Sequence, residues 1–491
     1  MGFGALPVRT PRRVVVTGIG MVTPLGLSTA DTWAAACRGQ SSIRSLLDAP
    51  HFLPGFIQHN RTLTPEEKQQ ALEKLVRAMP CKVAASIAAP SPLSSAGAAS
   101  NASPDPFSPS AVEPRSFKFC VRAVDEALGD AGLLTSTTTK EGVAVREVQL
   151  SDAVRDRVGV NIGMGIPSLA DTTDVSQYLV GDDIARPTGR VHYNKVHPLF
   201  VPKILGNMAA GNTAIRYKLR GPIGSSVAAC ATGAHCVGEA AAWIREGRAD
   251  VMVCGATEAC ITPVSVAGFS RMRALCTAYS ETPACASRPF DTRRAGFVMG
   301  EGAGILVLEA LEHAVARAAP RLYAELRGFG VSCDAYHVAA PHPDGLGAQH
   351  CIQQALLDGG NVPAAAVQYV NAHATGTIGD EVELAAIQNS LRPSKNADGP
   401  PLYVSSSKGG LGHLLGAAGS VEAGLAVVAL HEQRAPPTAN LTSSCLTDAQ
   451  RGAGIVCVQG DAALALKDCE AVISTSFGFG GINTALLFTR V

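Results

Sequence analysis

Short apolar runs that end in glycine-rich loops recur along the whole chain, and this pattern constrains the fold more than any other feature. Each run is apolar at consecutive positions, which is typical of strands buried on both faces of a sheet. Stretches with helical spacing, such as 237–245 and 414–431, lie between them. This alternation predicts an α/β protein built of layers. The runs are VVVTGIG (14–20), VGVNIGMG (158–165), ADVMVCGATEA (249–259), AGILVLEAL (303–311), VQYVNAHATGT (367–377), PLYVSSSKGG (401–410) and AVISTSFGFGG (471–481).

The length of 491 residues allows two or three domains with a large core, and the composition, 46% hydrophobic and 17% charged, fits a globular chain. A new series of strands begins after about residue 320, so we predict a division there, into halves 13–320 and 321–491. Residues 90–116 are rich in Pro, Ser and Ala without an apolar period, which predicts a flexible surface insertion.

The charge balance disfavours some classes of partner, although a local basic patch is still possible. Lys plus Arg and Asp plus Glu both number 41, which gives no support to binding of nucleic acid or of a membrane surface. No apolar run reaches the length of a membrane span. Residues 1–12 contain Arg9 and Arg12 and no acid, so they are either a short organelle-targeting segment or a basic tail.

One cysteine stands in an unusual setting, VAACATGAH (227–235). The chain has 14 cysteines and no C-x-x-C pair, which suits a reducing compartment where most cysteines are inert core residues. Cys230, however, precedes a stretch with helical spacing, and a helix N-terminus favours a thiolate. The small residues around it leave space for a substrate. Cys230 is therefore a candidate nucleophile, with a filler of a tight core as the alternative.

Two later motifs supply candidate partners for this thiol. NAHATGT contains His373, and SSSKGGLGH contains Lys408 and His413, in each case where an apolar run passes into a loop. Strand ends of this kind are where α/β proteins build their sites. A single histidine is more often a core residue, but two histidines and a lysine in matching contexts indicate a site.

In this order, VAACATGAH, NAHATGT, SSKGGLGHLLGAAG and SFGFGG resemble the β-ketoacyl-acyl-carrier-protein synthases, the condensing enzymes of the thiolase superfamily. The likeness extends from about residue 14 to 488 and also includes RPFDTRRAGFVMGEGAG and FVPKILGNMAAG. It implies a thiolase-like fold, a five-layered αβαβα core of two related halves, and a homodimer formed by sheet extension. The likeness is strongest to the elongating type of synthase, which is found in bacteria and in organelles.

The resemblance also implies a reaction. Cys230 would take an acyl group from the phosphopantetheine arm of an acyl-carrier protein, with the backbone N–H groups of Cys230 and Phe479 binding the oxyanion. His373 and His413 would then bind the thioester carbonyl of malonyl-carrier as CO2 leaves, with Lys408 as their electrostatic partner. The product would be a 3-oxoacyl-carrier in fatty acid elongation, formed without a metal or a cofactor of the protein's own.

Further residues take expected roles only through the resemblance. Thr375 and Thr377 would bind the pantetheine amides, and Ile166 would line the acyl pocket. Glu383 would be either the acid that pairs with Lys408 or an ordinary helix carboxylate. Phe477 and Phe479 would either gate the acyl tunnel or serve as packing residues. Arg273 would be a docking residue for an acidic carrier protein.

The chain departs from the family pattern at a few positions. The loop from Thr377 to Asp380 is one residue shorter than usual. Three positions carry a different residue: Leu411 replaces a threonine, Thr475 replaces an asparagine and Ile482 replaces a threonine. None of these changes removes the nucleophile, a histidine or the lysine. They bear on loop geometry and substrate preference.

Several alternatives stay open from the sequence. A thiolase needs a second reactive cysteine and a chalcone-type enzyme usually has asparagine in place of His413, so both are disfavoured. A polyketide condensing enzyme uses the same Cys-His-His set. A non-catalytic carrier-binding relative would lack Cys230. Ala374 and the stretches GMGIPSL and CKVAAS resemble organellar members, which predicts a mitochondrial location, with another organelle or the cytoplasm as alternatives.

Overall fold

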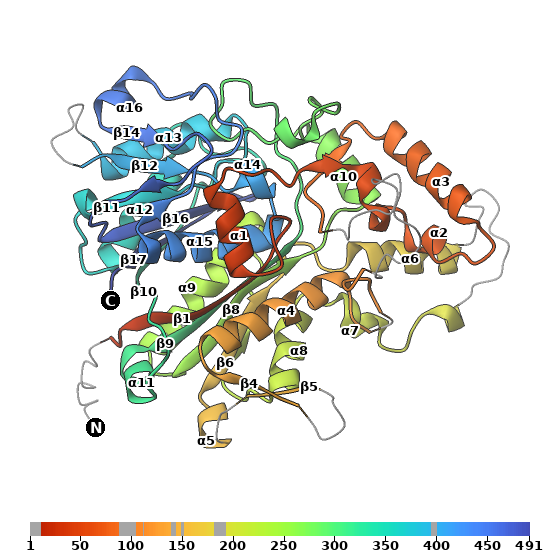
Figure 1. Cartoon of the computed structure of the whole chain (residues 1–491), viewed down its shortest axis with the longest axis horizontal. Coiled ribbons are helices and arrows are strands. Elements are labelled where there is room, and N and C mark those ends of the chain that lie inside the picture. Colours follow the sequence, from red (N-terminus) through yellow and green to blue (C-terminus); the bar gives the residue numbers. More distant parts are fainter. Residues whose placement is uncertain are drawn as a thin grey trace.

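Eleven strands of the described chain form one mixed sheet, in the order β14-β12-β11-β16-β17-β10-β1-β9-β8-β6-β7 (Figure 1). The sheet divides at its middle, because β1 and β10 pair only at Val15–Glu325 and Val16–Ala324. The structure is a computed structural model, which describes residues 11–87, 105–110, 112–138, 144–148, 152–180, 193–393 and 400–491.

The strands on either side of the β1–β10 pair repeat one pattern. In both groups the innermost strand is antiparallel to the next one, which is antiparallel to a third, and the strands beyond that are parallel. The predicted pair of related halves is therefore confirmed. The first group is β1 (Val14–Val22), β6 (Val158–Gly163), β7 (Ile223–Gly224), β8 (Val251–Glu258) and β9 (Gly302–Ala310); the second is β10 (Ala324–Cys333), β11 (Val367–Asn371), β12 (Leu402–Ser405), β14 (Ile455–Cys457), β16 (Ala471–Gly478) and β17 (Ile482–Thr489).

Helices cover both faces of each group of strands. In Figure 1, α9 (Thr232–Arg245) and α15 (Ala418–Glu432) lie between the two groups, and α4 (Arg115–Asp130) lies on the far face of the first. On the far face of the second group lie α12 (Leu346–Asp358) and α13 (Gly379–Leu391), which share a hydrophobic cluster with its strands. The order helix, strands, helices, strands, helices confirms the predicted five-layered αβαβα core.

Strand β9 shows why the strand sequences are apolar at consecutive positions. Leu306 and Leu308 belong to the central cluster with α9 and α15, whereas Ile305 and Val307 belong to the outer cluster with α4. Since both faces are covered, both sets of alternate side chains must be apolar. For the same reason the central helix α15 is buried on every side: Ala418 to Leu430 are buried without exception, and Ser420 and Glu422 are the two polar residues among them.

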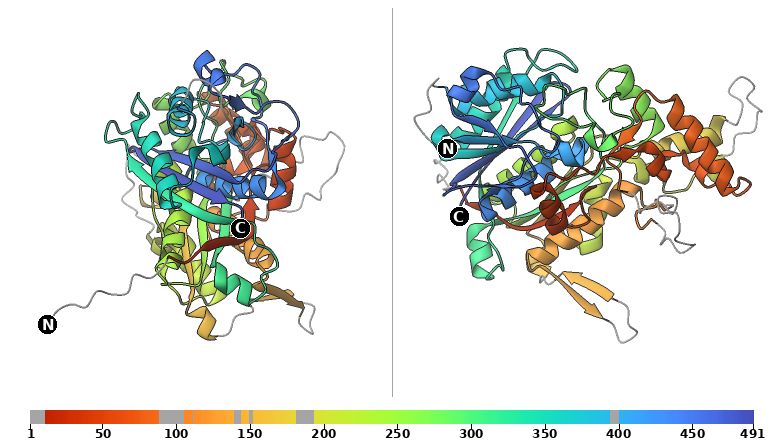
Figure 2. Two further views of the ribbon diagram at one scale, coloured as in Figure 1. Left: turned by 90° about the vertical axis from the view of Figure 1, so that its left-hand side faces the viewer. Right: turned by 45° about the horizontal axis from the view of Figure 1, so that its top comes forward.

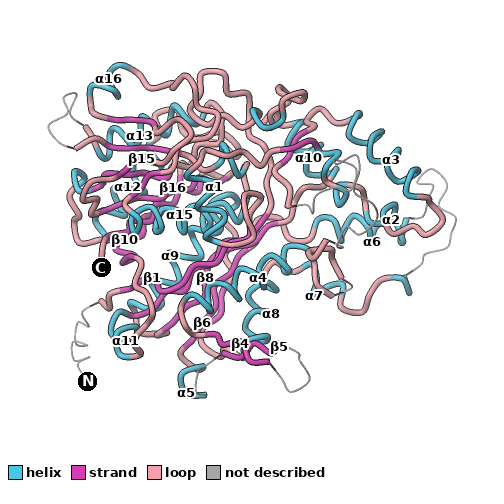
Figure 3. The backbone as a smooth tube through the Cα atoms, viewed as in Figure 1, coloured by secondary structure: helices cyan, strands magenta, loops and turns pink. Residues whose placement is uncertain are grey.

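The other elements surround this core, and the β4–β5 hairpin projects from the body (Figure 2). Loops fill the region between α13 and α10 (Figure 3). The other helices are α1 (Thr29–Cys37), α2 (Gly55–Gln58), α3 (Pro65–Ala78), α5 (Asp152–Arg155), α6 (Leu169–Val180), α7 (Phe200–Ile204), α8 (Met208–Tyr217), α10 (Pro263–Arg271), α11 (Leu311–Ala316), α14 (Lys408–Leu411) and α16 (Asp448–Gly452). The short strand pairs are β2–β3 (Arg44–Ser45, Val83–Ala84), β4–β5 (Leu134–Thr138, Ala144–Val148) and β13–β15 (Arg434–Ala435, Leu464–Ala465).

Two predicted boundaries need correction. The surface insertion predicted over 90–116 does not extend to its expected end, because Phe107 packs on Phe119 in the outer core and the buried Arg115 pairs with Glu301. Residues 88–104 lie outside the described part. The predicted tail 1–12 also ends earlier, since Arg12 forms an ion pair with Asp250 at 2.8 Å, while residues 1–10 lie outside the described part. No helix among the described residues is long and apolar enough to cross a membrane.

Candidate active site

Cys230 lies in a tight turn that leads directly into α9. A 3-10 turn over Ala229–Ala231 precedes the helix, and Ala229 has a left-handed φ of 47°. The turn is closed by Thr232, whose hydroxyl accepts the N–H of Ala228 at 2.9 Å and donates to the carbonyl of Ala229 at 2.7 Å. This geometry directs the Cys230 side chain into the wall of a cavity.

Burial controls the ionisation of this thiol. It raises the pKa of Cys230 to about 12, while the positive charge of Lys408 acts in the opposite direction. The expectation from sequence that the start of a helix would favour the thiolate is therefore outweighed by desolvation. A pKa this high favours the protonated thiol of Cys230 at neutral pH.

His373 and His413 lie together on the wall of the same cavity. Their ring centroids are 5.4 Å apart with the planes nearly perpendicular, and Phe297 lies 5.3 Å from the His413 ring. Burial, followed by the charge of Lys408, lowers the pKa of both rings well below the usual value. Both imidazoles are therefore neutral and each has one N–H to donate. Neither Nδ1 atom has a hydrogen-bond partner among the described residues.

Backbone hydrogen bonds fix the segment of each histidine. Glu383, on α13, accepts the N–H of His373 at 2.8 Å and that of Ala374 at 2.7 Å. Thr475 donates its hydroxyl to the same carboxylate at 2.7 Å. Position 475 has asparagine in the family pattern, and the threonine found here still gives Glu383 a polar partner. On the other side, the N–H of His413 donates to the carbonyl of Val298 at 2.7 Å. The side chains of both histidines are left free to face the cavity.

Lys408 is fully buried behind the cavity and forms an ion pair with Glu422 of α15. The expected pairing of Lys408 with Glu383 is wrong, because Glu383 is occupied by backbone N–H groups and by Thr475. Glu422 was missed from the sequence, although it is the one acid in the apolar stretch 414–431 and this was a signal for it. Lys408 does not line the cavity, and it affects Cys230 and both histidines through its charge.

Thr375 and Thr377 lie on the cavity wall with their hydroxyl oxygens 3.0 Å apart. Their loop is held by the buried carboxylate of Asp380, which accepts the N–H groups of Thr375, Gly376 and Thr377 at 3.1–3.2 Å. The loop is one residue shorter than the family pattern, yet this carboxylate still reaches back to close it. Both threonines therefore keep a defined orientation toward the cavity.

The SFGFGG loop lies directly against the nucleophile turn. A Cβ added at Gly478 would lie 2.6 Å from the carbonyl oxygen of Ala228 and 3.3 Å from the backbone nitrogen of Cys230. Only glycine permits this approach. Phe477 and Phe479, on either side of Gly478, both line the cavity, and the Phe477 ring lies 5.6 Å from that of His373.

A single cavity of about 700 Å³ brings most of the predicted residues together. Arg273 lies on its lining and is exposed, with a left-handed φ of 57°. Ile166 is not on this lining; it packs in the apolar cluster that contains Leu415, and Leu415 does line the cavity. The predicted residues on the lining are Cys230, Arg273, His373, Thr375, Thr377, Glu383, His413, Phe477 and Phe479.

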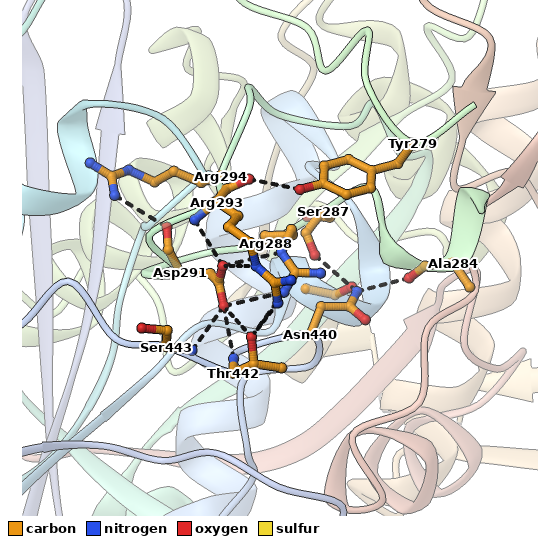
Figure 4. Close-up of polar contacts among 11 residues, drawn as sticks. Tyr279, Ala284, Ser287, Arg288, Asp291, Arg293, Arg294, Asn440, Thr442 and Ser443 are labelled. Carbon is orange, nitrogen blue, oxygen red and sulfur yellow. Dashed lines mark hydrogen bonds and ion pairs between the residues drawn. The ribbon is translucent and has the colours of Figure 1, made fainter. Parts of the chain in front are cut away.

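The buried carboxylate of Asp291 lies at the centre of a polar cluster (Figure 4), a few residues before Phe297 on the cavity lining. Asp291 accepts three backbone N–H groups, among them that of Thr442 at 2.8 Å, and pairs with the buried Arg288. Burial raises its pKa, but these bonds outweigh burial and hold the pKa well below the usual range. Next along the segment, Arg294 donates to the carbonyl of Thr377 at 2.7 Å. The segment is thereby tied to the threonine loop.

Comparisons with known proteins match most of the chain, including Cys230, His373, Lys408 and His413. Residues 11–314 match the family described as "Beta-ketoacyl synthase, N-terminal domain", and residues 323–442 match "Beta-ketoacyl synthase, C-terminal domain". The chain belongs to the β-ketoacyl synthase family. The resemblance inferred from the four motifs is confirmed.

Among family members, the chain is 39% identical to "3-oxoacyl-[acyl-carrier-protein] synthase, mitochondrial" of Arabidopsis thaliana, over 98% of this chain and 94% of that one. It is 38% identical to "3-oxoacyl-[acyl-carrier-protein] synthase 2" of Rhizobium meliloti, over 98% and 99%. A solved β-ketoacyl synthase from Burkholderia phymatum matches with a TM-score of 0.74 at 29% identity, over 98% of this chain and 100% of that one. A type II PKS ketosynthase with its acyl-carrier protein matches with a TM-score of 0.76 at 25% identity, with the same coverage.

The charge of Lys408 gives a first testable prediction for this member of the family. Lys408→Met should raise the pKa of His373 and of His413, because the cation that disfavours their protonated forms is gone. Release of CO2 from malonyl-carrier should slow by about tenfold, less than for loss of a direct donor. NMR titration of labelled histidines and a CO2 assay measure the two effects. Lys408→Arg keeps the cation and is the control; unchanged histidine pKa values in Lys408→Met would contradict the account.

Proposed function

We propose that this chain is a 3-oxoacyl-[acyl-carrier-protein] synthase that condenses an acyl group with malonyl-carrier and releases CO2. The observation that carries the proposal is that Cys230, His373 and His413 line one cavity. The 35–39% identity to proteins named 3-oxoacyl-[acyl-carrier-protein] synthase over nearly the whole chain supports it.

The first half-reaction is acyl transfer to Cys230. Its sulfur attacks the thioester carbon of an acyl-carrier, the carrier thiol leaves with a proton, and acyl-Cys230 remains. The tetrahedral oxyanion requires fixed donors. We assign these to the backbone N–H groups of Cys230 and Phe479, and the close approach of Gly478 to the Cys230 nitrogen supports the assignment.

The second half-reaction is decarboxylation followed by carbon–carbon bond formation. His373 and His413 donate hydrogen bonds to the thioester carbonyl of malonyl-carrier, so that loss of CO2 gives an enolate stabilised at its oxygen. The enolate carbon attacks acyl-Cys230, the C–S bond breaks, and the thiolate takes up a proton. The neutral state of both imidazoles suits this role, because a neutral ring donates without a full charge.

The remaining residues would position the substrates. Thr375 and Thr377 would bind the amides of the pantetheine arm, which the 3.0 Å pair of hydroxyls on the cavity wall supports. The exposed Arg273 would contact an acidic acyl-carrier protein. Ile166 would limit the acyl chain from behind Leu415, and Phe477 with Phe479 would gate the entrance. The carrier brings the pantetheine arm, so the protein would need no cofactor of its own.

Fatty acid elongation is favoured over polyketide synthesis. The ketosynthase of a type II PKS shares the fold at 25% identity, whereas relatives named for 3-oxoacyl-[acyl-carrier-protein] synthesis reach 39%. Three such relatives, from Arabidopsis thaliana, Saccharomyces cerevisiae and Schizosaccharomyces pombe, support a eukaryotic form, and two of the three are named mitochondrial. We therefore propose a mitochondrial location. We also propose that the two halves join near residue 320, between α11 and β10, which the family matches at 11–314 and 323–442 support.

We further propose a homodimer formed across the free edge of strand β7. This edge carries an exposed Ile223, and exposed apolar side chains lie on and beside the neighbouring α7 and α8. Such a patch on one side of a sheet edge is typical of an interface. The patch contains Leu199, Val201, Leu205, Ile215, Ile223 and Val227.

Replacing an apolar residue of this patch with a charge should separate the subunits. Ile223→Lys should raise the Kd of the dimer by about a hundredfold or more, because each copy would bury an unpaired cation. Sedimentation velocity measures the mass, which should fall toward the 50.5 kDa of one chain. Val456→Lys, at the opposite sheet edge, is the matched control and should leave the dimer intact. A wild-type protein that sediments as a monomer would overturn this interface.

One assay tests the proposed function. Purified protein is mixed with malonyl-carrier and a series of acyl-carriers, and the carrier products are analysed by mass spectrometry. We expect a 3-oxoacyl-carrier two carbons longer than the acyl group supplied, with release of CO2. Acyl groups that remain unextended while malonyl-carrier is intact would rule the proposal out.

A further inference from the structure

Glu258 is a fully buried carboxylate whose place in the site no motif indicated. It is the last residue of β8, with no side-chain exposure. Its Oε2 accepts the N–H of Gly165 at 2.9 Å, of Ile166 at 3.2 Å and of Gly416 at 3.2 Å. Within the described part of the chain, no lysine, arginine or histidine forms an ion pair with it. Backbone N–H groups are thus its main partners.

These N–H groups come from two different loops that meet at the carboxylate. Gly165 and Ile166 follow β6, and Gly416 lies in the 3-10 turn Leu415–Ala417 just after His413. The contact leaves no space for a side chain: a Cβ at Gly416 would lie 2.4 Å from the nitrogen of Gly165 and 2.7 Å from Oε2 of Glu258. One carboxylate therefore joins the two loops at a fixed separation.

Each loop bears on a different part of the site. Ile166 packs in the apolar cluster that contains Phe297 and Leu415, and both of these line the cavity. The second loop begins at His413, whose N–H donates to the carbonyl of Val298 and whose carbonyl accepts the N–H of Gly300. After these two bonds, the next bond from this segment to a side chain among the described residues is that from Gly416 to Glu258. A change at Glu258 would shift the acyl-facing wall and the His413 segment together.

We propose that Glu258 is a positioning residue that couples acyl chain-length selection to the placement of His413, by holding the Gly165–Ile166 loop against Gly416. The inference rests on the proposed function, because it assigns the acyl chain to the side of the cavity near Ile166. Glu258 does not line the cavity and does not touch the substrate. It acts through the two loops.

The test compares substitutions at Glu258 with one at Glu309, a second fully buried glutamate. Glu258 and Glu309 lie at opposite ends of the paired strands β8 and β9, since Glu258 is opposite Gly302 and Glu309 is opposite Val251. Single-turnover acylation of Cys230 is measured with acetyl-, hexanoyl-, decanoyl- and tetradecanoyl-carrier, beside kcat and KM for condensation and the thermal unfolding temperature.

We expect Glu258→Ala to change the ratio of long-chain to short-chain acylation by about tenfold. This corresponds to a difference of about 1.4 kcal/mol between the two chain lengths, which is typical of a change at one wall of an apolar pocket. Its kcat for condensation should fall more than its acylation rate. Glu258→Gln should restore much of the wild-type profile, because its carbonyl oxygen takes the place of Oε2. Glu309→Gln should lower stability and leave the profile unchanged.

Gly416→Ala provides a second route if Glu258→Ala fails to fold. It keeps the carboxylate but forces the two loops apart, so it should shift the chain-length ratio in the same direction. A wild-type ratio in both Gly416→Ala and Glu258→Ala, or an equal loss of acylation at every chain length in both, would overturn the inference. A wild-type protein that forms no acyl-Cys230 would instead show that the proposed function itself fails.

Discussion

Replacing Cys230 with alanine is expected to abolish both the acyl-enzyme and the condensation, to below the detection limit of each assay. The other cysteines within the described part of the chain lack this setting, because only Cys230 and Cys445 line the cavity, and Cys230 lies in the turn that Gly478 approaches. The fold should survive, since the change removes one small buried group, worth about 1 kcal/mol of unfolding free energy. Intact-mass analysis after incubation with acyl-carrier measures the first effect.

Cys230→Gln is the matched control for this result. Its amide carbonyl occupies the position of the acyl carbonyl, while His373 and His413 remain in place. We therefore expect release of CO2 from malonyl-carrier to continue without condensation. An acyl group that still attaches to Cys230→Ala would mean that another cysteine, with Cys445 the first to examine, is the nucleophile.

The second large effect is expected at the two histidines. His373→Ala or His413→Ala should lower CO2 release and condensation by about a hundredfold to a thousandfold, the usual loss for one donor to a developing oxyanion. Acylation of Cys230 should fall by less, because that step uses backbone donors. The loop should keep its shape, since Glu383 binds the backbone of His373 and not its ring.

Single-turnover acylation is measured beside CO2 release for each histidine variant. His350→Ala, at an exposed position on α12 outside the cavity, is the control and should leave both rates unchanged. If His373→Ala or His413→Ala lost acylation as fully as Cys230→Ala while CO2 release stayed normal, the division of labour would be wrong. The site would then act as a simple Cys-His pair.

The layers of the fold were predictable from local sequence, because consecutive apolar positions report burial on both faces of a strand. The same reasoning placed Cys230 before a helix and both histidines at strand or helix ends. It misjudged 105–116, where a single aromatic, Phe107, and the paired Arg115 fix a Pro-rich segment to the core. Composition describes a segment as a whole and does not detect two such anchors.

The partners of the site were less predictable, because they depend on contacts between distant segments. Glu422 is 14 residues from Lys408, and its position as the one acid in the apolar stretch 414–431 marks it as unusual without showing that Lys408 is its partner. The pKa of Cys230 likewise depends on how completely the fold removes water, which outweighs the local effect of the helix. Glu258 is a lone acid at the end of an apolar strand, and only the meeting of two loops explains it.

The most direct test of the account starts from isolated acyl-Cys230 protein mixed with malonyl-carrier for a single turnover. Three quantities are measured together: acyl groups lost from Cys230, CO2 released and 3-oxoacyl-carrier formed. The account predicts that all three are equal and share one rate constant, since one cavity performs both half-reactions. Loss of the acyl group as free acid, with no CO2 and no 3-oxoacyl-carrier, would contradict it.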